Sequence, residues 1–244
     1  MGRWDCVTPA EGGASAAGDP PPADQAITLP WTTGFEDGFC GFYSAGGFCY
    51  VNPAASYEVT SSPVHSGTSA AAFHIAGDPA VDGLQARCAR QGTLPAAAYY
   101  GAWFFIPDAV TATDNWNLFH FDGDTADVKH GLWDVSLAVG ADGNLYAFVF
   151  DFLRMLIRLP TGPADVPIGA WFHLEVYWER AADNTGSFEL YVDGALALSL
   201  TDLATDDTEI GQWYVGNLAK SLTPRPNTLY VDDVTIALER QGGP

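Results

Sequence analysis

The sequence is poor in positive charge. Its 244 residues include only 10 lysines and arginines against 30 aspartates and glutamates, which gives a formal net charge of −20 at pH 7. Nucleic acids and anionic membranes are bound through basic patches, so this composition argues against both as partners. A polyanionic substrate would need a local arginine cluster, which is feasible because charges beyond about 8 Å are screened at physiological salt.

Other features are absent as well. No run approaches the roughly 18 apolar residues of a membrane span, and residues 1–30 hold no apolar core of an export signal. Neither a long amphipathic helix nor an internal repeat is visible, which argues against helical and repeat architectures. Cys-x₂-Cys spacing is missing, so the sequence does not indicate a zinc site.

The chain does contain many short apolar segments separated by Gly, Pro, Asp and Asn, the pattern of β-strands. Aromatic residues reach 13%, and they favour strands and sugar-stacking surfaces. The number and spacing of the segments predict an all-β fold, a single antiparallel β-sandwich over residues 31–240. The expected strands are Ser56–Thr60, Ala70–Ile75, Leu84–Arg90, Tyr99–Ile106, Asn115–Phe121, Leu132–Val139, Leu145–Phe152, Trp171–Trp178, Ser187–Val192, Gln212–Val215 and Leu229–Leu238.

Residues 1–30 differ in composition from the rest. Thr8–Ala26 is rich in Ala, Gly, Pro and acidic residues, which predicts a disordered tether. Such a tether commonly precedes the folded domain of an exported protein, where it follows a removed signal.

Four cysteines allow three disulfide pairings, and buried free thiols are the alternative. Cys40 and Cys49 flank a glycine-bearing segment that would close as a local bridge, which leaves Cys6 to pair with Cys88. Disulfides would indicate an exported protein.

Two of the expected strands alternate between apolar and polar residues, and side chains of a strand alternate between its faces. In Trp171–Glu179 one set is apolar, whereas His173, Glu175 and Tyr177 belong to the other set; in Leu132–Val139 the polar set is Asp134 and Ser136. One sheet is therefore expected to present a wet face with aromatic and titratable groups, as a sugar-binding groove would. The candidate ligand-binding residues are His173, Glu175, Tyr177 and the glycine-flanked pair Trp213 and Tyr214.

Two segments resemble a known superfamily. Pro167–Tyr177, followed by Thr185–Gly194 with its Val-Asp-Gly hairpin, resembles the concanavalin A-like jelly roll of laminin G-type domains and of several polysaccharide lyases. Phe35–Phe42 resembles the start of MAM-type adhesion domains. The resemblance covers about residues 34–238 and implies the fold, which hosts lectins, hydrolases, lyases and adhesion modules.

Alginate-lyase-like members of this superfamily carry a Gln-x-His strand, an arginine-bearing strand and a tyrosine. That resemblance implies β-elimination, in which a base removes the proton beside a uronate carboxylate and a cation or amide neutralises the carboxylate. The candidates are His120 or Tyr100 as base or acid, Arg87 or Arg90 as carboxylate clamp, and Gln85 or Asn117 for further neutralisation. Asn117 and His120 are three residues apart, which predicts opposite faces of a regular strand and departs from the family spacing.

The Glu-x-Asp-x-x-Glu strand of laminarinase-type glycoside hydrolases is absent. Glu175 and Glu179 are four residues apart, about 13 Å along a strand. Retaining hydrolysis needs carboxyl groups only about 5–5.5 Å apart, so this pair does not indicate a hydrolase.

Acidic residues mark both ends of the expected sandwich, in Gly34–Gly38 and Tyr230–Ile236. First and last strands often lie side by side in this architecture, so Glu36, Asp232 and Asp233 are expected to meet. Oxygen ligands suit Ca²⁺, and we expect a structural calcium site there. Asp122, Asp124 and Asp127 form a second acidic segment that could bind Ca²⁺, although it lacks the EF-hand register.

The sequence thus predicts an exported β-sandwich that binds a polysaccharide or glycoconjugate on its concave face. Two alternatives stay open: a polysaccharide lyase acting by β-elimination on a uronate-containing polymer, and a structural or adhesion module without a small ligand.

Overall fold

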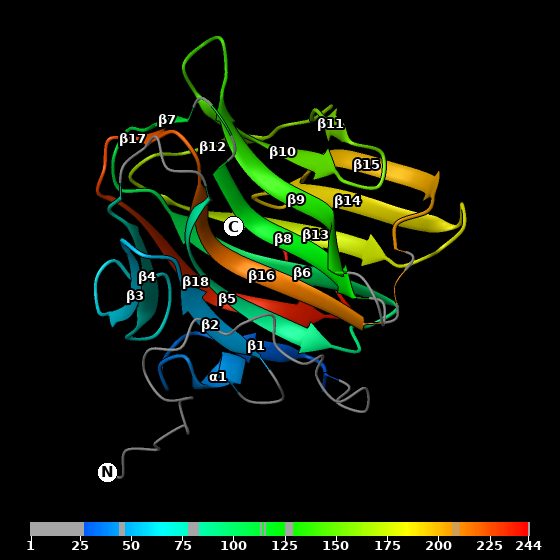
Figure 1. Cartoon of the computed structure of the whole chain (residues 1–244), viewed down its shortest axis with the longest axis horizontal. Coiled ribbons are helices and arrows are strands. Elements are labelled where there is room, and N and C mark those ends of the chain that lie inside the picture. Colours follow the sequence, from blue (N-terminus) through cyan, green and yellow to red (C-terminus); the bar gives the residue numbers. More distant parts are fainter. Residues whose placement is uncertain are drawn as a thin grey trace.

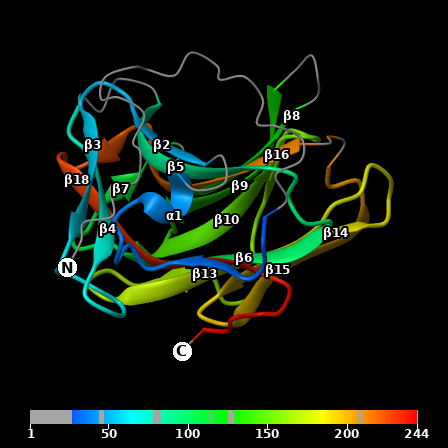
Figure 2. The same ribbon diagram turned by 90° about the horizontal axis from the view of Figure 1, so that it is seen from below.

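The computed structural model describes residues 27–43, 47–77, 83–112, 114, 116–124, 129–206, 208 and 210–243. Two large antiparallel sheets pack face to face, as Figure 1 and Figure 2 show from two directions, and this confirms the predicted all-β sandwich. The predicted tether lies mostly outside the described residues. Ile27 is buried and Leu29 packs against the core, so the folded domain already includes residue 27.

Sheet I contains both the first and the last of the described strands. Its strands, in spatial order, are β15 (Ala195–Leu203), β14 (Gly186–Val192), β13 (Trp171–Glu179), β6 (Ala97–Phe105), β18 (Asn227–Ala237), β4 (Ala70–Ile75) and β3 (Ala55–Thr60), and β1 (Trp31–Thr33) also pairs with β18.

Sheet II lies over sheet I and is nearer the viewer in Figure 1. Its strands, in spatial order, are β11 (Leu156–Arg158), β10 (Leu145–Asp151), β9 (Lys129–Val139), β8 (Trp116–Asp124), β16 (Ile210–Ala219), β5 (Leu84–Gly92) and β2 (Phe48–Val51), and β12 (Asp165–Val166) also pairs with β10. The remaining elements are the helical turn α1 (Cys40–Tyr43) and the small sheet of β7 (Thr111–Ala112) with β17 (Leu222–Thr223).

Turn chemistry explains the tight hairpins. Asp193 and Gly194, which join β14 to β15, both have positive φ, 48° and 77°. A two-residue hairpin turn of this kind favours Asp-Gly, since glycine adopts positive φ without a steric penalty.

The core between the sheets is aromatic. Trp213 of sheet II packs edge-on against Tyr100 of sheet I, with ring centroids 5.2 Å apart, and Trp178 packs against Phe121 at 5.1 Å. All four side chains are essentially fully buried. Because these large rings fill the space between the layers, the polar residues that alternate with them on sheet II must face outward.

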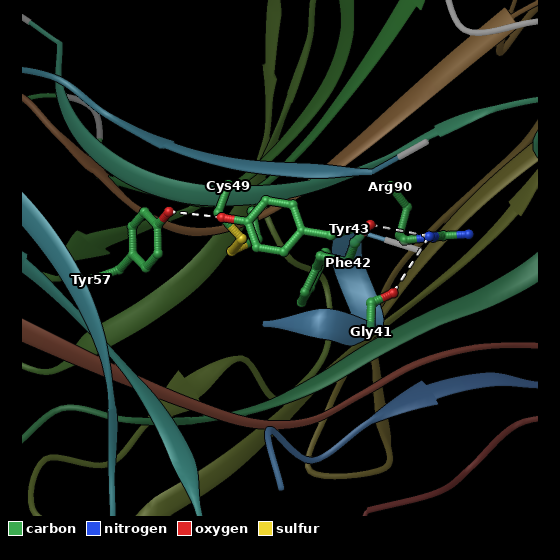
Figure 3. Close-up of a disulfide and its surroundings, with 7 residues drawn as sticks. Gly41, Phe42, Tyr43, Cys49, Tyr57 and Arg90 are labelled. Carbon is green, nitrogen blue, oxygen red and sulfur yellow. Dashed lines mark hydrogen bonds between the residues drawn. A yellow bond between two sulfur atoms is a disulfide. The ribbon is translucent and has the colours of Figure 1, made fainter. Parts of the chain in front are cut away.

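An arginine inside the fold holds the N-terminal segment. Arg90 lies over the ring of Trp31 at 4.9 Å. It also donates hydrogen bonds to the carbonyl oxygens of Gly41 and Phe42, as Figure 3 shows. Desolvation by burial lowers the pKa of Arg90 to about 10. This arginine therefore has a structural role in seating α1.

The disulfide connectivity differs from the expected one. Cys49 of β2 is bonded to Cys88 of β5 directly across the sheet, with Cα atoms 4.0 Å apart. The expected local Cys40–Cys49 bridge is therefore wrong, because β2 pairs with β5 and brings Cys49 opposite Cys88. Cys40 is also disulfide-bonded, and Cys6 lies outside the described residues.

In the part of the chain that the structure describes, no helix is long and apolar enough to cross a membrane.

Candidate functional site

A group of polar side chains lies on the outer face of sheet II, the face turned away from sheet I. Backbone pairing places Asp134 of β9 beside His120 of β8, and His120 beside Tyr214 of β16. Figure 1 shows these neighbouring strands crossing the front of the molecule. We call Arg87, Asn117, His120, Asp134 and Tyr214 the polar cluster.

A β-bulge brings Asn117 onto the same face as His120. The two residues are three apart on β8, but they pair with Ser136 and Asp134 of β9, which are only two apart. The extra residue on β8 reverses the alternation between them. The expectation that Asn117 and His120 lie on opposite faces is therefore wrong, because it assumed a regular strand.

His120 is held between two carboxylates. Its Nδ1 lies 2.5 Å from Oδ1 of Asp134, and its Nε2 lies 3.8 Å from Oδ2 of Asp122. Burial alone would lower the pKa of His120, but the charges and hydrogen bonds of Asp134 and Asp122 outweigh it and raise the pKa above its ordinary value. An imidazole oriented in this way by a carboxylate is suited to accept a proton at Nε2.

Arg87 lies across the same face with neutral partners. It donates hydrogen bonds to the Tyr50 hydroxyl at 2.7 Å and to Oδ1 of Asn117 at 3.4 Å, and its guanidinium carbon lies 4.7 Å from the centre of the Tyr214 ring. Only 6% of Arg87 is exposed. Within the described part of the chain it forms no ion pair, although a buried charge is usually paired.

A glycine makes room for this arginine. Gly216 of β16 is the backbone partner of Arg87 and has a φ of +142°. A Cβ at this position would lie 2.6 Å from the carbonyl oxygen of Ala86 and 3.2 Å from Cγ of Arg87. Gly216 therefore permits the close approach of β5 and β16 that lets Arg87 extend toward β8.

A pocket of about 480 Å³ adjoins the polar cluster on the same face. Three phenylalanines, Phe148, Phe150 and Phe152, form much of its wall, and Asp134 and Ser136 form the side toward β8. The ring of Phe152 lies 5.9 Å from that of His120. We call this cavity the phenylalanine pocket.

Three predicted site residues point inward instead. Tyr100 and Trp213 are completely buried between the sheets, and Arg90 contacts the N-terminal segment, so the structure does not bring them to the polar cluster. Gln85 stays on the outer face at its margin, where it accepts a hydrogen bond from the Tyr50 hydroxyl at 2.9 Å.

The predicted ligand residues on β13 lie on the outer face of sheet I, on the other side of the molecule. Glu175 accepts hydrogen bonds from Nε of Arg240 and from the backbone of Gln241, and Tyr177 packs against the ring of Tyr99. His173 is buried, and desolvation lowers its pKa to about 4. These three residues therefore do not join Tyr214 in one site.

The acidic residues from the two ends of the sandwich converge on one loop. Glu36 accepts hydrogen bonds from the backbone of Thr68 at 2.7 Å and of Ser69 at 3.1 Å. Asp232 accepts hydrogen bonds from the backbone of two residues earlier in the same loop, His65 and Ser66. Burial raises the pKa of Asp232 to about 6.

Asp233, the third predicted metal ligand, lies 2.7 Å from Nδ1 of His65. Among the residues described, no three His, Cys, Asp or Glu side chains are grouped as a metal centre. Of the second acidic segment, Asp122 belongs to the surroundings of His120, while Asp127 and the side chain of Asp124 lie outside the described residues.

Several residues of this face were not among the sequence candidates. Tyr50 and the three phenylalanines carry no motif, although the alternation of Phe148 and Phe150 with Ala147 and Val149 along β10 is visible in the sequence. Asp134 was expected on a wet face, but its pairing with His120 follows only from the register of β8 and β9.

The sequence matches no protein-family model, and no curated protein matches it. Among solved structures, an endo-β-1,4-glucuronan lyase from the fungus Trichoderma reesei is similar, with 20% identity, 79% of this chain and 90% of that chain covered, and a TM-score of 0.62. The cellulose-induced protein Cip1 has 18% identity, coverage of 87% and 99%, and a TM-score of 0.61. An alginate lyase from Pseudomonas aeruginosa has 13% identity, coverage of 70% and 83%, and a TM-score of 0.52. At these identities the similarity shows the fold alone.

Proposed function

We propose that the protein binds an acidic polysaccharide across the outer face of sheet II and cleaves it by β-elimination beside a uronate. The observation that carries this proposal is Arg87, a buried guanidinium with neutral partners in a chain of net charge −20. A uronate carboxylate would supply the missing counter-charge next to His120. The similar folds of lyases named for glucuronan and alginate support a polysaccharide as the ligand.

The elimination uses one proton shuttle. Nε2 of His120 takes the proton from C5 of the uronate, and the electrons of the C5–H bond form the C4=C5 double bond. The C4–O4 bond breaks with its electron pair on O4, and O4 then takes the proton from the imidazolium. The products are an unsaturated uronate and a new chain end, and no water is consumed.

The neighbours of His120 support each stage. Arg87 neutralises the uronate carboxylate, which makes the C5 proton more acidic. It also stabilises the negative charge that develops as this proton is removed. Asn117 accepts a hydrogen bond from Arg87 and donates one to the carbonyl oxygen of Phe119, so it helps to hold the guanidinium on this face. Asp134 holds Nδ1 of His120 and stabilises the imidazolium, as the raised pKa of His120 indicates.

Binding without cleavage is the second candidate function. The phenylalanine pocket favours it, because aromatic rings provide large apolar surfaces on which sugar rings can pack. This candidate uses the same face and differs only in the role of His120. A purely structural or adhesive role would give no reason for a buried arginine without an acidic partner.

The test is the absorbance near 235 nm of the unsaturated product, measured with a panel of uronate polymers. We expect activity in the wild type, a loss of about 10²- to 10⁴-fold in H120N because the base is removed, and a smaller loss in R87K, which keeps the charge but not the planar fork. H74N is the matched control, because His74 contacts Thr228 and Glu58 on sheet I. If the protein binds glycans but cleaves no uronate polymer, binding without cleavage remains as its function.

We further propose that the protein is exported and that Ca²⁺ ties the two ends of the sandwich together. The Cys49–Cys88 disulfide supports export, since disulfides persist in oxidising compartments. Glu36 and Asp232 supply hard oxygen atoms beside one loop, which is the ligand chemistry that Ca²⁺ prefers. Bound Ca²⁺ would offset the cost of burying the Asp232 carboxylate, whose pKa is raised to about 6.

A further inference from the structure

The phenylalanine pocket is continuous with the proposed elimination centre. Ser136, which forms part of its wall, is the backbone partner of Asn117, and Asn117 accepts a hydrogen bond from Arg87. Asp134, another wall residue, holds His120. A sugar in the pocket would therefore be adjacent to a uronate held at Arg87.

The wall of the pocket is apolar and negatively charged. Its described residues include three phenylalanines and the carboxylates of Asp114 and Asp134, but no lysine, arginine or histidine. Lys220 pairs with Asp114 at 3.3 Å in an exposed position.

The two arginines that follow β10 in the sequence do not contribute a positive charge to the pocket either. Arg154 and Arg158 both pair with the buried Asp151, at 3.2 Å and 2.9 Å. Asp151 alternates with Phe150 on β10 and so lies on the opposite side of that strand. Lys220 and His120 already pair with the two wall carboxylates, Asp114 and Asp134. A uronate carboxylate in the pocket would therefore lose hydration beside these carboxylates, and the described wall residues offer it no cation of their own.

We propose that the phenylalanine pocket is a subsite for an uncharged sugar, so that the polymer cleaved at His120 alternates a uronate with a neutral residue. This inference rests on the proposed elimination and restricts its substrate class. A neutral ring packs on the phenylalanines at no electrostatic cost, while the uronate next to it pairs with Arg87. The two neighbouring subsites thus differ in charge, which disfavours a polymer made of uronates only.

The test compares initial elimination rates on uronate homopolymers with those on polymers that alternate glucuronate with rhamnose or N-acetylglucosamine. We expect kcat/KM to be at least about tenfold higher on an alternating polymer, equivalent to about 1.4 kcal/mol. F150A should lower the rate on that polymer roughly two- to tenfold through the lost ring contact, while L159A, an exposed change outside the pocket, should not. A138K, which adds a cation to the pocket wall, should shift the preference toward homopolymers.

Equal or faster cleavage of homopolymers, unchanged by A138K, would overturn the subsite and leave the elimination intact. Calorimetric binding of short oligosaccharides of both kinds to H120N separates the two proposals further. Preferential binding of the alternating oligosaccharide without any cleavage by the wild type would uphold the subsite and overturn the elimination. Absence of that preference in binding would overturn the subsite whatever the activity.

Discussion

Gly216→Ala is a sharp test of how the polar cluster is built. Gly216 lies in an irregular part of β16, where the pairing with β8 shifts between Val215 and Leu218. Its φ of +142° is one that side-chain-bearing residues rarely adopt. An added Cβ would also lie 2.8 Å from Cα of Arg87 and 2.6 Å from a backbone oxygen of β5, so the two strands would have to separate.

Two costs add up in this variant. A non-glycine residue held at such a φ costs about 1–2 kcal/mol, and overpacking against a neighbouring backbone costs about another 1–3 kcal/mol. The sum, about 2–5 kcal/mol, corresponds to a fall in Tm of roughly 4–20 °C in a chain of this size. The same displacement moves Arg87 away from Asn117, so the proposed elimination should be lost in protein that is still folded.

Gly143→Ala is the matched control. Gly143 also has a positive φ, +86°, but a Cβ there would meet nothing within 4 Å. This variant should show only the conformational cost of about 1–2 kcal/mol and keep its activity. The measurement is thermal unfolding of both variants beside the wild type, followed by elimination assays well below Tm. Equal Tm losses in the two variants would refute the close approach that we derive for β5 and β16.

Three further predictions concern the pH profile, the metal and the disulfide. In D134N the pKa of His120 should fall, because Asp134 helps to raise it. The acid limb of the pH profile of kcat/KM should therefore move to lower pH. An acid limb that does not move would count against His120 as the base. Millimolar Ca²⁺ should raise Tm by several degrees over chelator in the wild type and not in E36Q, and equal shifts in both proteins would reject the site. Replacing Cys49 and Cys88 with serine opens a bridge across 39 residues and should lower the free energy of unfolding by about 4 kcal/mol in denaturant titrations, whereas an unchanged midpoint would show that β2 stays paired without it.

Much of the fold could be predicted because its signals are local. The Val-Asp-Gly hairpin at Gly194, the two-residue alternation of Trp171–Glu179 and the spacing of short apolar segments each depend on neighbouring residues alone. The disulfide pairing could not be predicted, because it depends on which strand lies beside β2. Chain proximity favoured Cys40 as the partner of Cys49, but the register of β2 with β5 placed Cys88 there.

The site was harder to predict for the same reason. His120, Arg87 and Asn117 could be listed from their chemistry, but one extra residue on β8 decides that Asn117 faces the same way as His120. Arg87 and Arg90 look equivalent in the sequence, and their odd spacing sends one to each side of β5. Residue type alone does not show whether a side chain reaches the site: Tyr100 has suitable chemistry, but it is completely buried in the core.

The most direct test of the central proposal is the formation of unsaturated product by wild type, R87K and H120N on an acidic polysaccharide. Absorbance near 235 nm should rise with the wild type, rise much more slowly with R87K and stay at the blank rate with H120N, while all three proteins keep the same Tm within a few degrees. Undiminished product formation by H120N, in protein whose Tm matches the wild type, would contradict the proposed role of the polar cluster.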